Sequence, residues 1–175
     1  QLSPGADPTL PASWCPAEPV YGIGGWGTPG EPNPACPTIE PADALSTVQP
    51  GELVITEIMK DPTAVDGDFG EYVELQNRSG RTIDLQGLEL VDEVGDGVQV
   101  VDRAVLAPDG FAVFAASADP TLNGGIEDVL LGWGTDYGLR NSDDVVVLRF
   151  GTRVFDEVAY DNGDTFPDSS GISFQ

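Results

Sequence analysis

Short runs in which apolar and polar residues alternate follow one another through residues 51–175. Leu53 to Met59 is a strong β run, and Glu71 to Leu75 alternates so that Val73 and Leu75 share one face. Apolar residues do not recur at helical spacing, because Gly and Pro interrupt every window long enough to test. The pattern therefore predicts strands throughout this part of the chain.

Turn residues separate the predicted strands. Gly87 interrupts the run from Thr82 to Val91 and indicates a bend or bulge. Ala107-Pro108-Asp109-Gly110 predicts a four-residue hairpin turn, and Gly151-Thr152 predicts a two-residue hairpin. Many short strands with turns about every 8–12 residues are typical of an all-β, immunoglobulin-like β-sandwich.

The first 50 residues have a different composition. They hold 11 of the 15 prolines and five acidic residues, but no Lys or Arg. Proline fixes φ and lacks a backbone donor, so this region is expected to be extended and rich in turns. We predict three parts: a Pro/Gly-rich arm (residues 1–36), a Pro-containing linker (37–50) and a β-sandwich (51–175).

Charge narrows the possible functions. The 175 residues include 30 Asp and Glu, 7 Lys and Arg and no His, so the formal net charge is -23. This charge disfavours nucleic acid and anionic membranes as partners, and no stretch is long and apolar enough to predict insertion into a membrane. The lack of His excludes Ser-His-Asp and Cys-His active sites within this chain.

Several strings in the β-rich part together resemble the lamin tail domain family, in the form found in secreted and surface proteins of bacteria. They follow the family order and cover nearly all of residues 51–175: GELVITEIMKDP (51–62), EYVELQN (71–77), IDLQGLEL (83–90), LAPDGFAVFA (106–115), LRNSDDVVVL (139–148) and FDEVAYDNGDTFPDSSG (155–171). The resemblance implies an immunoglobulin-like β-sandwich and a non-catalytic module with structural or interaction roles.

The resemblance departs from the family at the end of the domain. In the family, the segment after FPDSSG continues to a Leu-rich strand, a WC-type stretch and a GTPG motif. Here the matching strings lie in the arm, as Gln1 to Pro4, Trp14 to Ala17 and Gly27 to Asn33. We therefore expect the last segment of a lamin tail domain to be displaced to the N-terminus.

Three arrangements would restore a complete domain. The arm could fold back on its own sandwich, because a 14-residue linker (37–50) spans up to roughly 45 Å. It could instead complete the next subunit, which would give a ring or filament. It could also finish the preceding repeat of a tandem array. A stiff, Pro-rich linker favours exchange over folding back.

The function expected from these observations is that of a non-catalytic, extracellular or cell-surface structural protein. Its copies would form a head-to-tail filament or fibre by exchange of the N-terminal arm. The alternative is one repeat, or an accessory binding or spacer module, of a larger secreted protein whose neighbouring repeats are its partners. A calcium- and carboxylate-dependent hydrolase is a third hypothesis, which no motif requires.

Cysteines and aromatic residues mark the arm. Cys15 and Cys36 are the only cysteines and flank a Pro/Gly-rich loop, which predicts a disulfide and an oxidising compartment. The alternative is a pair of reduced, buried thiols. Trp14 and Trp26, with Tyr21, are expected to insert into a sandwich, either their own or that of a neighbouring subunit.

Acidic clusters in loops suggest calcium as a possible cofactor, because calcium prefers several carboxylate and carbonyl oxygens on one loop. Two candidate sites are predicted, and their residues are Asp61, Asp66, Asp68 and Glu71 in one, and Asp143, Asp144, Asp161 and Asp164 in the other. The alternative is that these residues only form soluble turns. No cofactor other than calcium is expected.

Overall fold

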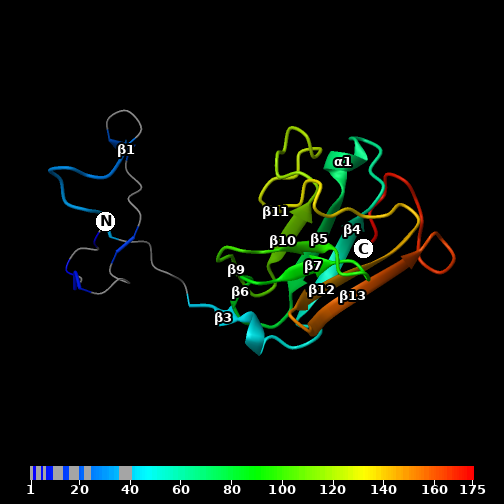
Figure 1. The fold of residues 1–175 in the computed structure, drawn as a ribbon, viewed down its shortest axis with the longest axis horizontal. Helices are drawn as coiled ribbons and strands as arrows, with labels where there is room; N and C mark the ends of the chain where they lie inside the picture. The colour runs from blue at the N-terminus through cyan, green and yellow to red at the C-terminus, as the bar shows by residue number, and fades with distance from the viewer. Residues whose placement is uncertain are drawn as a thin grey trace. The chain divides into compact units, whose positions relative to one another are not determined.

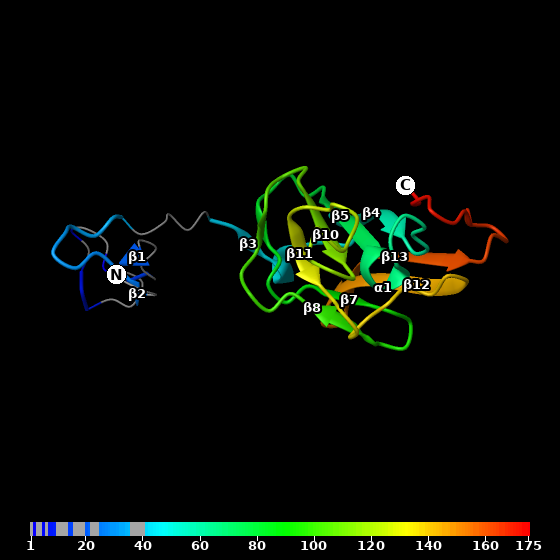
Figure 2. The same ribbon diagram turned by 90° about the horizontal axis from the view of Figure 1, so that it is seen from above.

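A computed structural model describes residues 2, 5, 7–9, 14, 15, 20, 21, 25–35 and 41–175, leaving aside the side chains of residues 20, 21, 67 and 68. The chain divides into two compact units, an N-terminal unit of residues 1–40 and a second unit of residues 41–175, called the body below. Figures 1 and 2 show the strands of the body from two directions.

The described residues of the N-terminal unit include two short paired strands. Strands β1 (Val20–Tyr21) and β2 (Gly25–Trp26) pair in antiparallel fashion. A further antiparallel bridge joins Leu2 to Trp14, and the indole N–H of Trp14 donates to the carbonyl of Pro8 at 3.1 Å. The side chains of Trp14 and Trp26 remain 54% and 64% exposed.

The body is built from strands β3 to β13 in three sheets (Figure 1). The first large sheet has the order β11 (Val129–Gly132), β10 (Phe111–Ala115), β5 (Tyr72–Asn77) and β4 (Leu53–Met59). The second has the order β13 (Arg153–Asp161), β12 (Asp143–Phe150), β7 (Glu89–Val91) and β8 (Gly97–Gln99). The small third sheet joins β3 (Asp43–Ala44), β6 (Ile83–Asp84) and β9 (Val105–Leu106).

The core lies between the two large sheets. Val73 and Leu75 of β5 are fully buried, as the alternation in this strand predicts, and Val146 and Leu148 of β12 are buried in the same cluster. The only regular helical segments in the body are the single turns α1 (Gly67–Gly70) and η2 (Leu45–Thr47). These features confirm the all-β, immunoglobulin-like sandwich.

One connection and one strand differ from the sequence prediction. The turn from Ala107 to Gly110 was expected to close a hairpin, but β9 pairs with β6 whereas β10 pairs with β5. This turn is therefore a corner at which the chain passes from one sheet to another. Strand β11 has no counterpart in the sequence prediction; it runs parallel to β10. The hairpin at Gly151-Thr152 is confirmed, because it joins β12 to β13.

Residues 41–50, which the sequence places in a linker, lie within the body. Strand β3 pairs in parallel with β6, and Leu45 and Val48 are buried in the core. The burial of these two apolar side chains explains why this stretch packs on the sandwich although Pro41 and Pro50 flank it.

Candidate functional site

Among the described residues, the outer edge of strand β4 has a gap in its backbone pairing. Near the start of the strand, the N–H of Gly51 donates to the carbonyl of Phe155 at 2.8 Å. Near its end, Ile58 and Phe174 exchange two backbone hydrogen bonds of 3.0 and 2.9 Å as an antiparallel pair. Between these points the N–H of Ile55 donates to the carboxylate of Asp156 at 2.8 Å. A charged side chain thus takes the place of a strand carbonyl, which is one way in which proteins protect a sheet edge.

A small cavity of about 180 Å³ lies beside this gap. Its walls come from β4, β13 and the segment after β13, through Ile55, Thr56, Glu57, Ile58, Val158, Phe166, Phe174 and Gln175. The side chains of Ile55, Val158 and Phe166 are partly buried and pack against the core. The gap in backbone pairing and an apolar cavity therefore coincide, and this place is called the β4 groove below.

Polar groups fix the rim of the β4 groove. The carboxylate of Glu57 accepts hydrogen bonds from the hydroxyl of Tyr72 at 2.6 Å and from the hydroxyl of Ser173. Burial acts to raise the pKa of Glu57, but the hydrogen bonds from Ser173, Tyr72 and Gln175 together outweigh burial. The pKa of Glu57 is therefore lowered below its ordinary value. Burial and the bond to Glu57 raise the pKa of Tyr72 to about 12. The rim is therefore occupied by an ionised Glu57 and a neutral Tyr72 at physiological pH.

Lys60, the single lysine of the chain, holds the C-terminal wall of the β4 groove. Its side chain is 3% exposed, and its Nζ lies 2.5 Å from Oδ1 of Asp168. The same Nζ donates to the carbonyl of Asn141 and lies 5.3 Å and 5.8 Å from the ring centroids of Tyr160 and Phe174. One buried cation thus ties the end of β4 to the loop before β12 and to the C-terminal segment.

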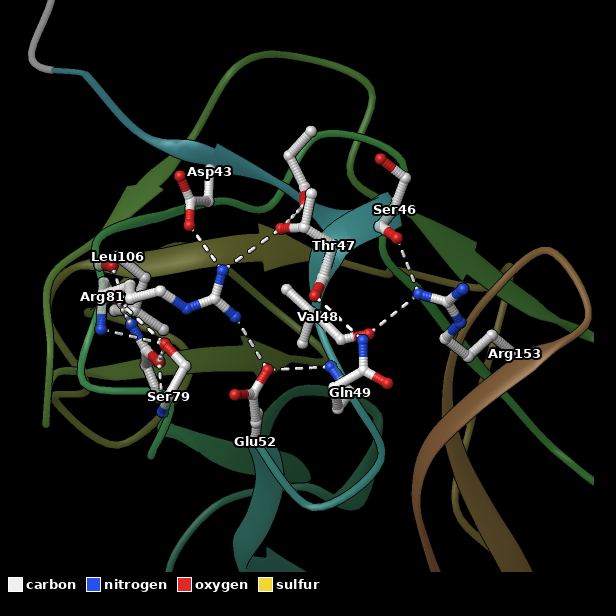
Figure 3. A network of polar contacts seen from close by, with 12 residues as sticks. Asp43, Ser46, Thr47, Val48, Gln49, Glu52, Ser79, Arg81, Leu106 and Arg153 are labelled. Carbon is white, nitrogen blue, oxygen red and sulfur yellow. Dashed lines mark hydrogen bonds and ion pairs between the residues drawn. The ribbon is translucent and has the colours of Figure 1, made fainter.

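Two arginines hold residues 41–50 on the body (Figure 3). The guanidinium of Arg81 donates to Asp43 at 2.5 Å and to Glu52 at 2.8 Å. Arg153 donates to the carbonyls of Ser46 and Val48 at 2.7 and 2.9 Å. These contacts add to the burial of Leu45 and Val48 and hold this stretch within the body.

The first predicted calcium cluster surrounds α1. Asp61, Asp66 and Glu71 are described, whereas the side chain of Asp68 lies outside the described residues. Oε2 of Glu71 accepts the N–H of Leu139 at 3.0 Å, and Oδ1 of Asp61 accepts a long bond from Asn141 at 3.4 Å. Both of these carboxylates are thus held by the same segment, the loop that precedes β12.

The second predicted cluster is brought together only in part. Asp143 lies directly opposite Asp161 in the β12–β13 ladder. Asp144 is buried and accepts the N–H groups of Arg140 and Val145, while Asp164 is exposed. Hydrogen bonds from Thr165 and Phe166 lower the pKa of Asp161 to about 2. Within residues 41–175 and the described parts of the N-terminal unit, no three acidic or Cys side chains are placed to hold a metal ion. Calcium binding at either cluster stays a prediction.

The residues predicted in the arm are described only partly. Cys15 is not a free cysteine, but Cys36 lies outside the described residues, so the disulfide between them stays a prediction. The backbone of Tyr21 is in β1, and its side chain lies outside the described residues. Trp14 and Trp26 are exposed, and their insertion into a sandwich stays a prediction as well.

Sequence reasoning did not find Lys60, Asp156 or the two arginines as functional residues. The available signal for Lys60 was that it is the single lysine of a strongly acidic chain. A buried carboxylate is stabilised when a cation pairs with it. Asp156 gave no signal, since its role depends on the N–H of a residue 101 positions away.

The fold agrees with a comparison between the chain and known protein families. A model of the lamin tail domain matches residues 46–162, more than half of the chain. The chain belongs to the lamin tail domain family. Lamin tail domains have an immunoglobulin-like structural fold and are generally non-catalytic. The match ends before the segment that forms the wall of the β4 groove, so the displacement of the family's last segment remains a prediction.

No curated protein matches this lamin tail domain chain. Among its described residues, no helix has the length and apolar character that a membrane crossing requires.

Proposed function

We propose that this protein is a non-catalytic structural protein of the cell exterior or cell surface whose copies assemble head to tail. The arm of one copy would add a strand to the β4 groove of the next. The observation that carries the proposal is the gap in the outer edge of β4, beside an apolar cavity and next to the antiparallel pair of Ile58 and Phe174. Unpaired strand edges are common sites at which a further strand is added.

The direction of the existing pair indicates where an added strand would run. A strand that continues the antiparallel pairing of Phe174 with Ile58 passes Glu57, Thr56 and Ile55 in that order. The sequence resemblance places Leu2 to Pro4 of the arm at this point of the domain. Each backbone hydrogen bond gained would contribute about 1 kcal/mol, and Ile55 and Val158 would lose their remaining contact with water.

The attachment of residues 41–50 to the body supports exchange over folding back. Because Arg81 and Arg153 hold residues 41–50 on the body, only four residues (37–40) of the predicted 14-residue linker would connect the arm to it. Four extended residues span at most about 14 Å. A short connection limits access to the protein's own β4 groove and favours pairing with a second copy.

The chain's charge and predicted disulfide are consistent with the proposed location. Copies with a formal net charge of -23 repel one another, so close assembly needs cations. Calcium outside the cell is the cation that the acidic loops would take. The predicted disulfide between Cys15 and Cys36 would form in the same oxidising compartment.

The experiment compares two substitutions on the same strand. Val158→Arg places a charged side chain in the β4 groove, whereas Val154→Arg places one at a residue of β13 that is already 40% exposed. Purified full-length protein is examined by light scattering over a range of concentrations and by electron microscopy. We expect wild type and Val154→Arg to form oligomers or fibres and Val158→Arg to remain at 18.4 kDa.

Several outcomes would contradict this proposal. A wild-type protein that stays monomeric at high concentration would exclude self-assembly, and fibres formed by Val158→Arg would exclude the β4 groove. Removal of residues 1–36 gives a second test, for which we expect an unstable body with an exposed apolar edge. The alternative, one repeat or accessory module of a larger secreted protein, predicts a second copy of the GELVITEIM or GTPG motif in the open reading frame.

A further inference from the structure

A second and larger cavity lies at a different place in the body. It has a volume of about 500 Å³ and is lined by residues that include Phe69, Glu71, Ser117, Trp133, Thr135 and Tyr137. These residues come from α1, the segment after it, and the loops that follow β10 and β11. Because β10 and β11 are parallel, both of these loops leave the sheet at the same end, near α1 (Figure 1).

Three aromatic side chains, those of Phe69, Trp133 and Tyr137, line this cavity. Trp133 is 3% exposed and packs edge to face with Tyr137, with ring centroids 5.3 Å apart. Phe69 is 40% exposed. The backbone N–H of Trp133 donates to the carbonyl of Ala115 at 2.8 Å, which fixes the loop that carries this ring to the sheet. The aromatic lining is thus largely formed before any ligand arrives.

The polar side chains that line the cavity are one carboxylate and three hydroxyl groups, and their oxygen atoms offer negative charge or lone pairs. Oε2 of Glu71 is held by the N–H of Leu139 at 3.0 Å, so its carboxylate is fixed in the wall. The hydroxyl of Tyr137 is buried and is the one buried side-chain polar atom of the described residues without a hydrogen-bond partner. Burial raises the pKa of Tyr137, and the acidic side chains of Asp144, Asp92 and Glu71 raise it further. Tyr137 is therefore neutral, in a region of negative potential.

This combination selects a class of ligand. Calcium needs six to eight oxygen ligands, whereas Glu71 supplies the single carboxylate among the residues that line the cavity. Aromatic faces beside a carboxylate attract organic cations, because the ring quadrupole is negative above the ring. We propose that this cavity binds an organic ammonium ion, with Glu71 as its counter-charge and Phe69, Trp133 and Tyr137 as its aromatic walls. The site is independent of arm exchange, since none of these residues lines the β4 groove.

The experiment uses ligands that differ in charge but hardly in shape. Choline chloride and its neutral carbon analogue 3,3-dimethylbutan-1-ol are titrated into the full-length protein by calorimetry, and n-butylammonium chloride serves as a primary ammonium. We expect at least one of the two ammonium ions, choline or butylammonium, to bind with a Kd of about 1 mM or tighter. The neutral alcohol should bind at least about tenfold more weakly.

Substitutions of the residues that line the cavity, with a control elsewhere on the surface, test which side chains bind the ammonium ion. We expect Glu71→Gln, which keeps an acceptor for Leu139, to weaken ammonium binding about tenfold. Phe69→Ala should weaken it about three- to tenfold, while Phe111→Ala, which also truncates an exposed phenylalanine, should leave it unchanged. The midpoint of thermal unfolding checks that each variant is folded.

Three results would overturn the inference. The first is equal affinity for choline and the neutral alcohol, which would show a merely apolar pocket. The second is a Glu71→Gln variant that binds ammonium as well as wild type does. The third is calcium binding that depends on Glu71 in a protein that binds neither ammonium ion.

Discussion

Replacing Lys60 with methionine tests whether one buried cation holds the C-terminal wall of the β4 groove. Methionine has similar length and no charge, so the change removes the ion pair with Asp168, the hydrogen bond to the carbonyl of Asn141 and the contacts with two aromatic rings. Removing one partner of a fully buried pair costs about 3–5 kcal/mol. Because the side chain of Asp168 is 33% exposed, water recovers part of this energy, and we expect a loss of about 2–3 kcal/mol.

Thermal and urea unfolding measure this loss. For a domain of this size we expect the midpoint of thermal unfolding to fall by roughly 8–12 °C. Limited proteolysis should also cut Lys60→Met faster than wild type within residues 162–172, since Phe174 and Gly171 lose the support that keeps them against β4.

A surface ion pair supplies the control. Arg149 lies 2.8 Å from Glu89 on neighbouring strands, and its side chain is 33% exposed. We expect Arg149→Met to cost at most about 1 kcal/mol. A Lys60→Met variant that loses no more than this control, or whose C-terminal segment is as resistant to protease as that of wild type, would refute the reasoning.

Two further predictions concern buried and exposed polar groups. Asn77 is fully buried and its amide donates to the carbonyls of Arg81, Leu106 and Ala107; Asn77→Leu should therefore cost about 3 kcal/mol or more in urea unfolding, and a loss below 1 kcal/mol would contradict this. The pKa of Asp161 is lowered from 3.8 to about 2 in the folded protein, so its hydrogen bonds stabilise the fold above about pH 4 and are lost as the pH falls towards 2. The difference in thermal midpoint between wild type and Asp161→Asn should shrink over this range, and a difference independent of pH would show that the carboxylate has no such role.

The sequence by itself predicted the elements whose signals are local. Strand β4 and the β12–β13 hairpin follow from β-branched runs and a two-residue turn, and the buried face of β5 follows from the alternation that puts Val73 and Leu75 on one side. The family resemblance was also carried by strings within the sequence, and the match to residues 46–162 confirms it.

The tertiary structure decided the features that depend on contacts between distant residues. The turn from Ala107 to Gly110 has the residues of a hairpin, but the partners of β9 and β10 make it a corner between sheets. Residues 41–50 look like a linker until Leu45 and Val48 are seen to be buried. Lys60 and Asp168 are 108 positions apart in the sequence, and they meet in the fold where the C-terminal segment pairs with the end of β4. Local patterning specifies which face of a strand is apolar, whereas only the packed sandwich determines which edges remain open and which charges meet.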